Sequence, residues 1–225
     1  MDFGKFILIC GHYGCGKTNF ALNLAADIRQ TGERVTVVDL DIVNPYFRSS
    51  DYPEFLENLD IELIAPTYAR SNVDLPSLPA EMYSMFLKEG TVILDVGGDD
   101  VGATVLGRFS RYISEKQYQM LYVVNKFRSK HPSVEETSEL LAEIEQKSRL
   151  KATGVVSNAH LIEYTTPETV ADGAVFAKDV ADRLSLPLQA VTCKRELMTD
   201  VRQIMKDKAD SLYPIDIIVK KPWEI

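Results

Sequence analysis

Residues 11–18 form the stretch of this chain best suited to bind phosphate. They read Gly-His-Tyr-Gly-Cys-Gly-Lys-Thr and match the phosphate-loop pattern G-x-x-x-x-G-K-[ST] at every fixed position. Glycines in such a loop let backbone N–H groups approach an anion, and the N-terminus of the following helix adds partial positive charge. In this pattern Lys17 is expected to contact the β- and γ-phosphates of a nucleotide, and the Thr18 hydroxyl to bind Mg²⁺. The predicted nucleotide contacts in and after the loop are Gly11, Gly14, Cys15, Gly16, Lys17, Thr18 and Asn19.

The segments on either side of the loop are the ones that this chemistry requires. Residues 5–10 are mostly apolar and predict a short buried strand. After the loop, apolar residues recur on one face of a predicted helix, and Gly32 stands where its C-terminal cap is expected. The alternative is a glycine-rich turn that binds nothing. The order of strand, loop and helix favours the phosphate site.

Two carboxylates follow the next predicted strand, residues 34–38. Asp39 and Asp41 alternate along the chain, so their side chains point to the same face. Close carboxylates repel each other, and a bound Mg²⁺ would relieve that repulsion. We therefore predict Asp39 and Asp41 as metal ligands, and residues 39–50 as a first switch-like segment. The alternative is that one of the two carboxylates only caps the next turn.

A third carboxylate, Asp95, ends the predicted buried strand over residues 91–96. It is expected to hold Mg²⁺ through water. Gly98 is placed to offer its backbone N–H to the γ-phosphate, because no side chain blocks that approach. Asp99, Asp100 and Gly102 extend this loop, so residues 95–104 are predicted to form a second switch-like segment. An acidic turn that merely joins strand to helix is the alternative.

The residues after two later strands bear on the choice of base. Asn125-Lys126-Phe127-Arg128 resembles the guanine-reading motif N-K-x-D, but Arg128 stands where that motif has aspartate. Without this carboxylate the acceptor pair that reads guanine is missing, which favours ATP over GTP. Asn158, at the end of the predicted strand 153–158, is expected to contact the adenine edge.

The remaining pattern predicts one α/β domain over residues 1–225. Helices are expected over residues 51–59, 78–88, 135–147, 167–184 and 194–208, strands over 61–65, 120–124 and 188–192, a surface excursion over 66–79, and a docked C-terminal tail with an edge strand over 213–225. No apolar run is long enough for a membrane span, so stable membrane insertion is not expected, and no signal-peptide pattern is present. Three cysteines without metal-ligand spacing predict a reduced, cytoplasmic protein. The net charge of −8 argues against broad nucleic-acid binding.

Taken together, the loop at 11–18, Asp39 and Asp41, Asp95 with Gly98, and Asn158 resemble the MinD/ParA/CobQ-like branch of P-loop nucleotide-binding proteins, a group of SIMIBI-type NTPases. The resemblance implies a three-layer P-loop NTPase fold with a mostly parallel sheet, Mg-ATP binding and ATP-driven homodimerisation. By this likeness Asp41 positions or activates the attacking water, and Lys17 acts with it on the terminal phosphate.

One departure from this family concerns the residue after the first glycine of the loop. The family typically has a lysine there that reaches across a dimer, whereas this chain has His12, which is not a permanent cation. The sequence therefore leaves homodimer formation open.

The leading functional prediction is a Mg-ATPase that acts as a nucleotide-controlled switch on a protein client that the sequence does not identify. The alternatives are an ATP-dependent ligase that activates a carboxylate, similar to cobyrinate diamide synthase, a metallochaperone GTPase, and a scaffold that binds nucleotide without turnover. Arg128 and the lack of Cys-x-x-Cys or His-rich runs disfavour the metallochaperone.

Overall fold

The computed structural model describes residues 4–41, 47–66, 80–98, 100–128 and 133–220. Within them one parallel sheet of eight strands has the order β3-β2-β4-β1-β5-β6-β7-β8. The strands are β1 (Phe6–Gly11), β2 (Val35–Leu40), β3 (Glu62–Ile64), β4 (Thr91–Val96), β5 (Tyr118–Val124), β6 (Gly154–Ser157), β7 (Leu188–Lys194) and β8 (Leu212–Ile215). The α-helices are α1 (Lys17–Gln30), α2 (Pro53–Asn58), α3 (Asp100–Ser114), α4 (Val134–Ser148), α5 (Pro167–Leu184) and α6 (Met198–Met205).

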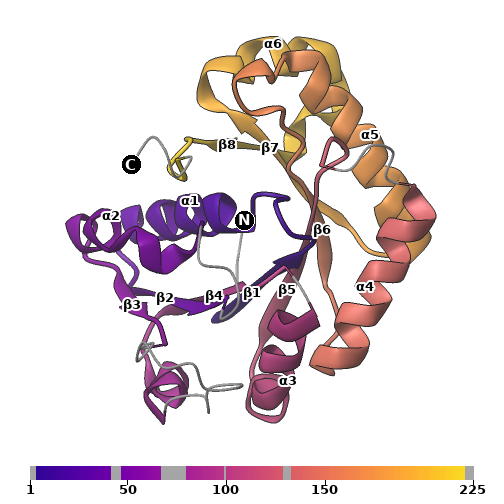
Figure 1. The fold of residues 1–225 in the computed structure, drawn as a ribbon. Coiled ribbons are helices and arrows are strands. Elements are labelled where there is room, and N and C mark those ends of the chain that lie inside the picture. The colour runs from indigo at the N-terminus through magenta and orange to yellow at the C-terminus, as the bar shows by residue number, and fades with distance from the viewer. Residues whose placement is uncertain (1–3, 42–46, 67–79, 99, 129–132, 221–225) are drawn as a thin grey trace.

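The alternation of side chains along each strand produces three layers. In β1, Phe6, Leu8 and Cys10 join the apolar cluster on the face covered by α3, α4 and α5. Ile7 and Ile9 point to the opposite face and pack with α1 and α2. Figure 1 shows these helices on the two sides of the sheet, with α6 beyond β7. Because both faces are covered, β1, β2 and β4 are buried along their whole length and are mostly apolar, as expected for a parallel sheet.

Most predicted elements are present, and two differ in a way that matters. Residues 80–87 form a 3₁₀ helix (Ala80–Leu87) rather than an α-helix. Helix α3 begins at Asp100, so Asp100 and Gly102 lie in its first turn rather than in a loop. A Cβ on Gly102 would lie 2.3 Å from the Gly97 carbonyl oxygen, which explains how the helix can start so close to the strand end. Of the predicted excursion over 66–79, residues 67–79 lie outside the described residues, as does Asp99.

Parallel strands place their carboxyl ends at one edge of the sheet, where ligands bind in open α/β folds. β2, β4 and β1 are consecutive neighbours in this sheet, so the segments after them meet at that edge. These are the segments that carry residues 11–18, Asp41 and residues 97–98. Within the part of the chain that the structure describes, none of the helices combines the length and apolar character needed to cross a bilayer.

Candidate functional site

The loop between β1 and α1 has the backbone that its glycines permit. Gly14 (φ 73°) and Gly16 (φ 86°) adopt left-handed conformations that other residues rarely take. A Cβ on Gly16 would also lie 2.2 Å from the Asn158 side-chain nitrogen, so this position has no room for a side chain. Lys17 is buried, and its Nζ donates to the His12 carbonyl oxygen at 3.2 Å. The loop is therefore preformed with its lysine held inside the curve of the backbone.

Asp39 and Asp95 are buried side by side on neighbouring strands, in register with each other. Asp95 Oδ2 accepts a 2.6 Å hydrogen bond from the Ser49 hydroxyl. Burial, and next the charge of Asp39, raise the pKa of Asp95 to about 7, while hydrogen bonds from Ser49 and the Thr18 hydroxyl oppose the shift. Burial likewise raises the pKa of Asp39. An added cation would stabilise the charged form of this pair.

The two carboxylates are used differently by the surrounding chain. Asp39 Oδ1 accepts from the backbone N–H of Asp41 at 2.9 Å, and Oδ2 accepts from that of Ser50 at 3.1 Å. Asp39 thus fixes both ends of the segment between residues 41 and 50. Asp95 instead contacts the Thr18 hydroxyl. Carboxylate and hydroxyl oxygens suit Mg²⁺, so Thr18 and Asp95 are the pair whose chemistry fits that ion. The described residues contain no group of three or more His, Cys, Asp or Glu that could hold a metal on its own.

The segments after β2 and β4 touch each other and the loop. A Cβ on Gly97 would lie 3.1 Å from Asp41 Oδ1. A Cβ on Gly98 would lie 2.6 Å from the backbone nitrogen of Tyr13 and 2.7 Å from Lys17 Nζ. Glycine is therefore required at 98 for the chain to pass this close to the loop. The arrangement brings Asp41, Gly98 and Lys17 to one place.

Asn158 lies directly behind the loop, and both ends of its side-chain amide are engaged. Its Nδ2 donates to the Cys15 carbonyl oxygen at 2.7 Å, and its Oδ1 accepts from the Thr192 hydroxyl at 2.5 Å. In this structure Asn158 thus connects β6 and β7 to the phosphate loop. Its contact with adenine stays a prediction, for which one amide hydrogen remains.

Arg128, which breaks the guanine motif, lies against the loop. Its Nε donates to the Tyr13 carbonyl oxygen at 3.1 Å, and its guanidinium carbon lies 5.4 Å from the Tyr13 ring centroid. A Cβ on Gly14 would lie 2.2 Å from the same Nε. The turn that carries Arg128 is fixed by Asn125, whose Oδ1 accepts from the N–H of Phe127 at 3.0 Å. A cation thus stands beside the glycines where the motif would have placed an anion.

A cavity of about 670 Å³ opens beside these residues, within the usual range for small-molecule sites. It brings together the predicted residues Gly14, Gly16, Lys17, Thr18, Asn19, Asp41 and Asn158. The predicted contacts Gly11 and Cys15 are buried and do not line it, and Asp39, Asp95 and Gly98 do not line it either. The lining also includes residues that sequence reasoning missed, namely His160, Ile162, Thr192, Lys194, Ile215, Ile217, Val219 and Lys220.

Two of the missed groups differ in whether the sequence carried a signal for them. Ser49, which bonds Asp95, lies within the predicted segment 39–50, but nothing in its residue type or spacing singled it out. For the C-terminal residues of the cavity the sequence did carry a signal. Asn19 and Asn23 are two amides four residues apart on a helix whose other inward residues are mostly apolar. Such a pair on a buried face needs polar partners, and the C-terminal chain supplies them.

The fold and the loop geometry define a nucleotide-binding protein of the P-loop class. Residues 7–166 match the family model described as the CobQ/CobB/MinD/ParA nucleotide binding domain. The match spans most of the chain, so this protein belongs to that family. The sequence has no significant match among curated proteins.

The fold is also similar to solved structures of low sequence identity. Cell division protein FtsY from Thermotoga maritima is 16% identical with a TM-score of 0.57, over 95% of this chain and 65% of that one. Signal recognition particle receptor FtsY from Elizabethkingia anophelis, in complex with GDP, is 14% identical with a TM-score of 0.54, over 85% and 58%. The 54 kDa signal recognition particle protein from Aeropyrum pernix, also in complex with GDP, is 16% identical with a TM-score of 0.55, over 83% and 41%. This chain thus spans less than two thirds of each of them, and the likeness is one of fold.

Proposed function

We propose that this protein binds Mg-ATP and acts as a nucleotide-controlled switch that hydrolyses ATP. The observation that carries the proposal is the meeting of three segments at one end of the sheet. Gly98 lies against Tyr13 and Lys17 of the loop, and Gly97 lies against Asp41. A terminal phosphate bound by Lys17 would therefore border both segments that follow β2 and β4. A ligand that contacts both segments can bias their conformation.

Each site residue has a role in this proposal. Backbone N–H groups of the loop and Lys17 Nζ bind the β- and γ-phosphates, and the Thr18 hydroxyl and Asp95 hold Mg²⁺. When bound, Mg²⁺ neutralises charge on the phosphate oxygens. Asp41, at the edge of the cavity, orients the attacking water. Lys17 would exchange its 3.2 Å bond with the His12 carbonyl for phosphate oxygens.

Adenine rather than guanine is the proposed base. Arg128 lies on the backbone of Tyr13 and presents donors, so the chain lacks at this position the carboxylate that would accept from guanine's ring nitrogen and amino group. Two of the structurally similar proteins are in complex with GDP, but at 14% and 16% identity the likeness is one of fold and does not extend to the base. Competition between ATP and GTP for a fluorescent nucleotide analogue tests the base, and tighter GTP binding would overturn the choice of adenine.

The switch is tested by hydrogen exchange with a non-hydrolysable ATP analogue and with ADP, both with Mg²⁺. Residues 41–50 and 97–104 should be more protected with the analogue, because only the γ-phosphate reaches both segments. Lys17→Ala should remove the difference, since it removes the phosphate contact. Equal protection of wild-type segments in the two nucleotide states would contradict the switch. A ligase that consumes ATP would then be the better account.

A further inference from the structure

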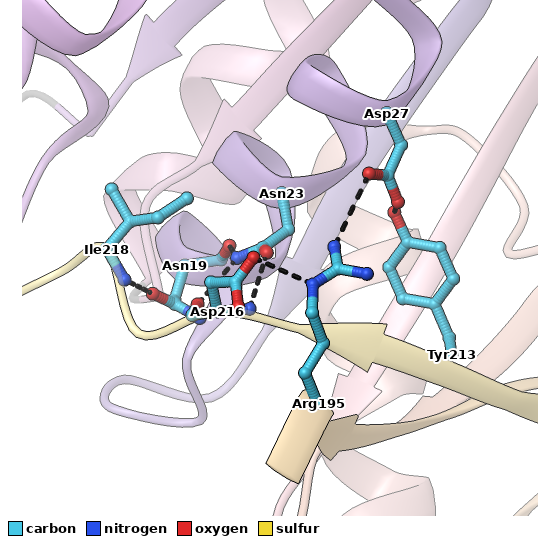
Figure 2. Close-up of polar contacts among 7 residues, drawn as sticks. All are labelled: Asn19, Asn23, Asp27, Arg195, Tyr213, Asp216 and Ile218. Carbon is cyan, nitrogen blue, oxygen red and sulfur yellow. Dashed lines mark hydrogen bonds and ion pairs between the residues drawn. The ribbon is translucent and has the colours of Figure 1, made fainter. Parts of the chain in front are cut away.

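The C-terminal segment, residues 212–220, is fastened to the helix that follows the phosphate loop. Strand β8 pairs with β7 at the sheet edge, and the chain then runs along α1 (Figure 2). Asn19 Oδ1 accepts from the N–H groups of Ile218 at 2.8 Å and Val219 at 3.0 Å. Its Nδ2 donates to the Asp216 carbonyl oxygen at 3.0 Å. The Asn19 side chain is thus committed to the C-terminal chain, which leaves its backbone N–H for phosphate.

Asn23, one turn further along α1, holds the same stretch. Its Oδ1 accepts from the Asp216 N–H at 2.7 Å, and its Nδ2 donates to the Asp216 carbonyl oxygen at 2.9 Å. Asn19 and Asn23 are 9% and 3% exposed, so their side-chain amides bond these backbone groups in place of water. A buried amide that loses its partner costs more than an exposed one. The segment is therefore held in a fixed position.

Side chains add a second set of contacts at the start of the segment. The Tyr213 hydroxyl donates to Asp27 Oδ2 at 2.6 Å, and Arg195 Nε donates to Asp216 Oδ2 at 3.0 Å. Arg195 also lies 3.8 Å from Asp27 Oδ1. Figure 2 shows that these groups join α1 and β8 with Arg195, the residue that follows β7. The segment thus connects the strand that closes the sheet with the helix that begins at Lys17.

One face of this extended segment lines the nucleotide cavity. Ile215, Ile217, Val219 and Lys220 border the cavity, whereas Asp216 and Ile218 do not. From Ile215 to Ile217 this is the spacing of an extended chain, which turns alternate side chains to opposite sides. At residues 218 and 219 the chain bends, because the consecutive N–H groups of Ile218 and Val219 both donate to Asn19 Oδ1. Ile217 is a large apolar side chain that is 53% exposed. An apolar row beside phosphate-binding residues suits a flat, largely apolar group of the ligand.

The cavity has a second exposed isoleucine, Ile162, in the segment after β6. Ile162 is 50% exposed and has φ 57°, a conformation that is unfavourable for a β-branched residue. Strained residues of this kind concentrate at ligand sites. Ile162 follows β6 and Ile217 follows β8, and both border the same cavity.

From this arrangement, and on the basis of the proposed nucleotide binding, we infer that the C-terminal segment is part of the nucleotide site: Ile215, Ile217 and Val219 form the wall against which a purine base packs. Asn23 is a positioning residue that holds this wall through Asp216 without lining the cavity. Because Asn19 follows Thr18 directly, one turn of α1 holds both the phosphates and the base wall.

The test compares two probes that differ in the base, Mg-ATP and magnesium tripolyphosphate, by calorimetry on the full chain. Ile217→Ser should weaken ATP binding about tenfold, which is about 1.4 kcal/mol, and leave tripolyphosphate binding unchanged. Val175→Ser is the matched control, since Val175 is 55% exposed on α5 and does not line the cavity. Asn23→Ala should lower ATP affinity more than tripolyphosphate affinity, because its two bonds to Asp216 hold the wall.

The outcomes separate this inference from the proposed function. Wild-type protein that binds neither probe would refute nucleotide binding itself. Wild-type binding of ATP with an unchanged affinity in Ile217→Ser would overturn the base wall and leave nucleotide binding intact. Equal weakening of both probes would also overturn it, because the substitution would then act on the phosphate loop. If Asn23→Ala does not fold, the Ile217→Ser comparison decides.

Discussion

Replacing Asp95 by Asn should stabilise the nucleotide-free protein while weakening Mg-ATP binding. Asp95 is 1% exposed and lies beside Asp39, and these two effects raise its pKa from 3.8 to about 7. The folded state therefore holds a proton on Asp95 more tightly than the unfolded chain does. The contribution of protonated Asp95 to the free energy of unfolding is complete below about pH 4, and it is lost as the pH rises through about 7. Above pH 8 the ionised carboxylate costs on the order of 4 kcal/mol, at about 1.36 kcal/mol per pKa unit.

Asparagine removes this cost and keeps an oxygen that can accept from the Ser49 hydroxyl, which now bonds Asp95 at 2.6 Å. Urea unfolding of wild type and Asp95→Asn at pH 5 and pH 8.5 measures the effect. The variant should gain clearly less at pH 5 than at pH 8.5, where the gain is on the order of 4 kcal/mol, or several degrees in Tm for a chain of this size. Asp182→Asn, at an exposed carboxylate paired with Lys178, is the control and should shift stability by less than about 1 kcal/mol at either pH.

A variant that is less stable than wild type at pH 8.5, or that keeps the wild-type pH dependence, would refute this reasoning. The same preparation tests function, because Asn cannot supply a charged oxygen donor to Mg²⁺. The dependence of ATP affinity on Mg²⁺ should therefore weaken in the variant. Opposite signs for stability and binding would identify Asp95 as a residue kept for its ligand rather than for the fold.

Three further outcomes follow from the site. Lys17→Ala should lower ATP affinity at least tenfold in calorimetry, because a hydrogen bond to a charged group contributes about 1.5–3 kcal/mol; unchanged affinity would remove the phosphate assignment. Gly98→Ala should reduce the preference for triphosphate over diphosphate in the same assay, because its methyl group would lie 2.6 Å from the Tyr13 nitrogen; equal preference in variant and wild type would count against the contact. Arg128→Asp should raise GTP affinity relative to ATP in competition, and no change would show that this position does not face the base.

Local sequence was enough to predict the elements whose cause is local. The loop at 11–18 needs particular residues at particular positions, and buried strands such as residues 91–96 are read from continuous apolar runs. The fold class was predicted correctly, since the sheet is parallel and covered by helices on both faces. Helix α5 was predicted with its bounds, because Pro167 marks its first residue and the apolar period continues to Leu184.

Tertiary structure alone decided which distant groups serve the site. The bonds from Asn158 to Cys15 and from Arg128 to Tyr13 cross 143 and 115 residues. The bond from Asn19 to Asp216 crosses 197. Spacing indicates at most that Asn19 and Asn23 need polar partners, and not which residues supply them. The partners depend on the strand order, which places β5, β6, β7 and β8 in succession on one side of β1. The sequence thus determined that a phosphate site exists after the first strand, and the packing of the whole sheet decided what surrounds it.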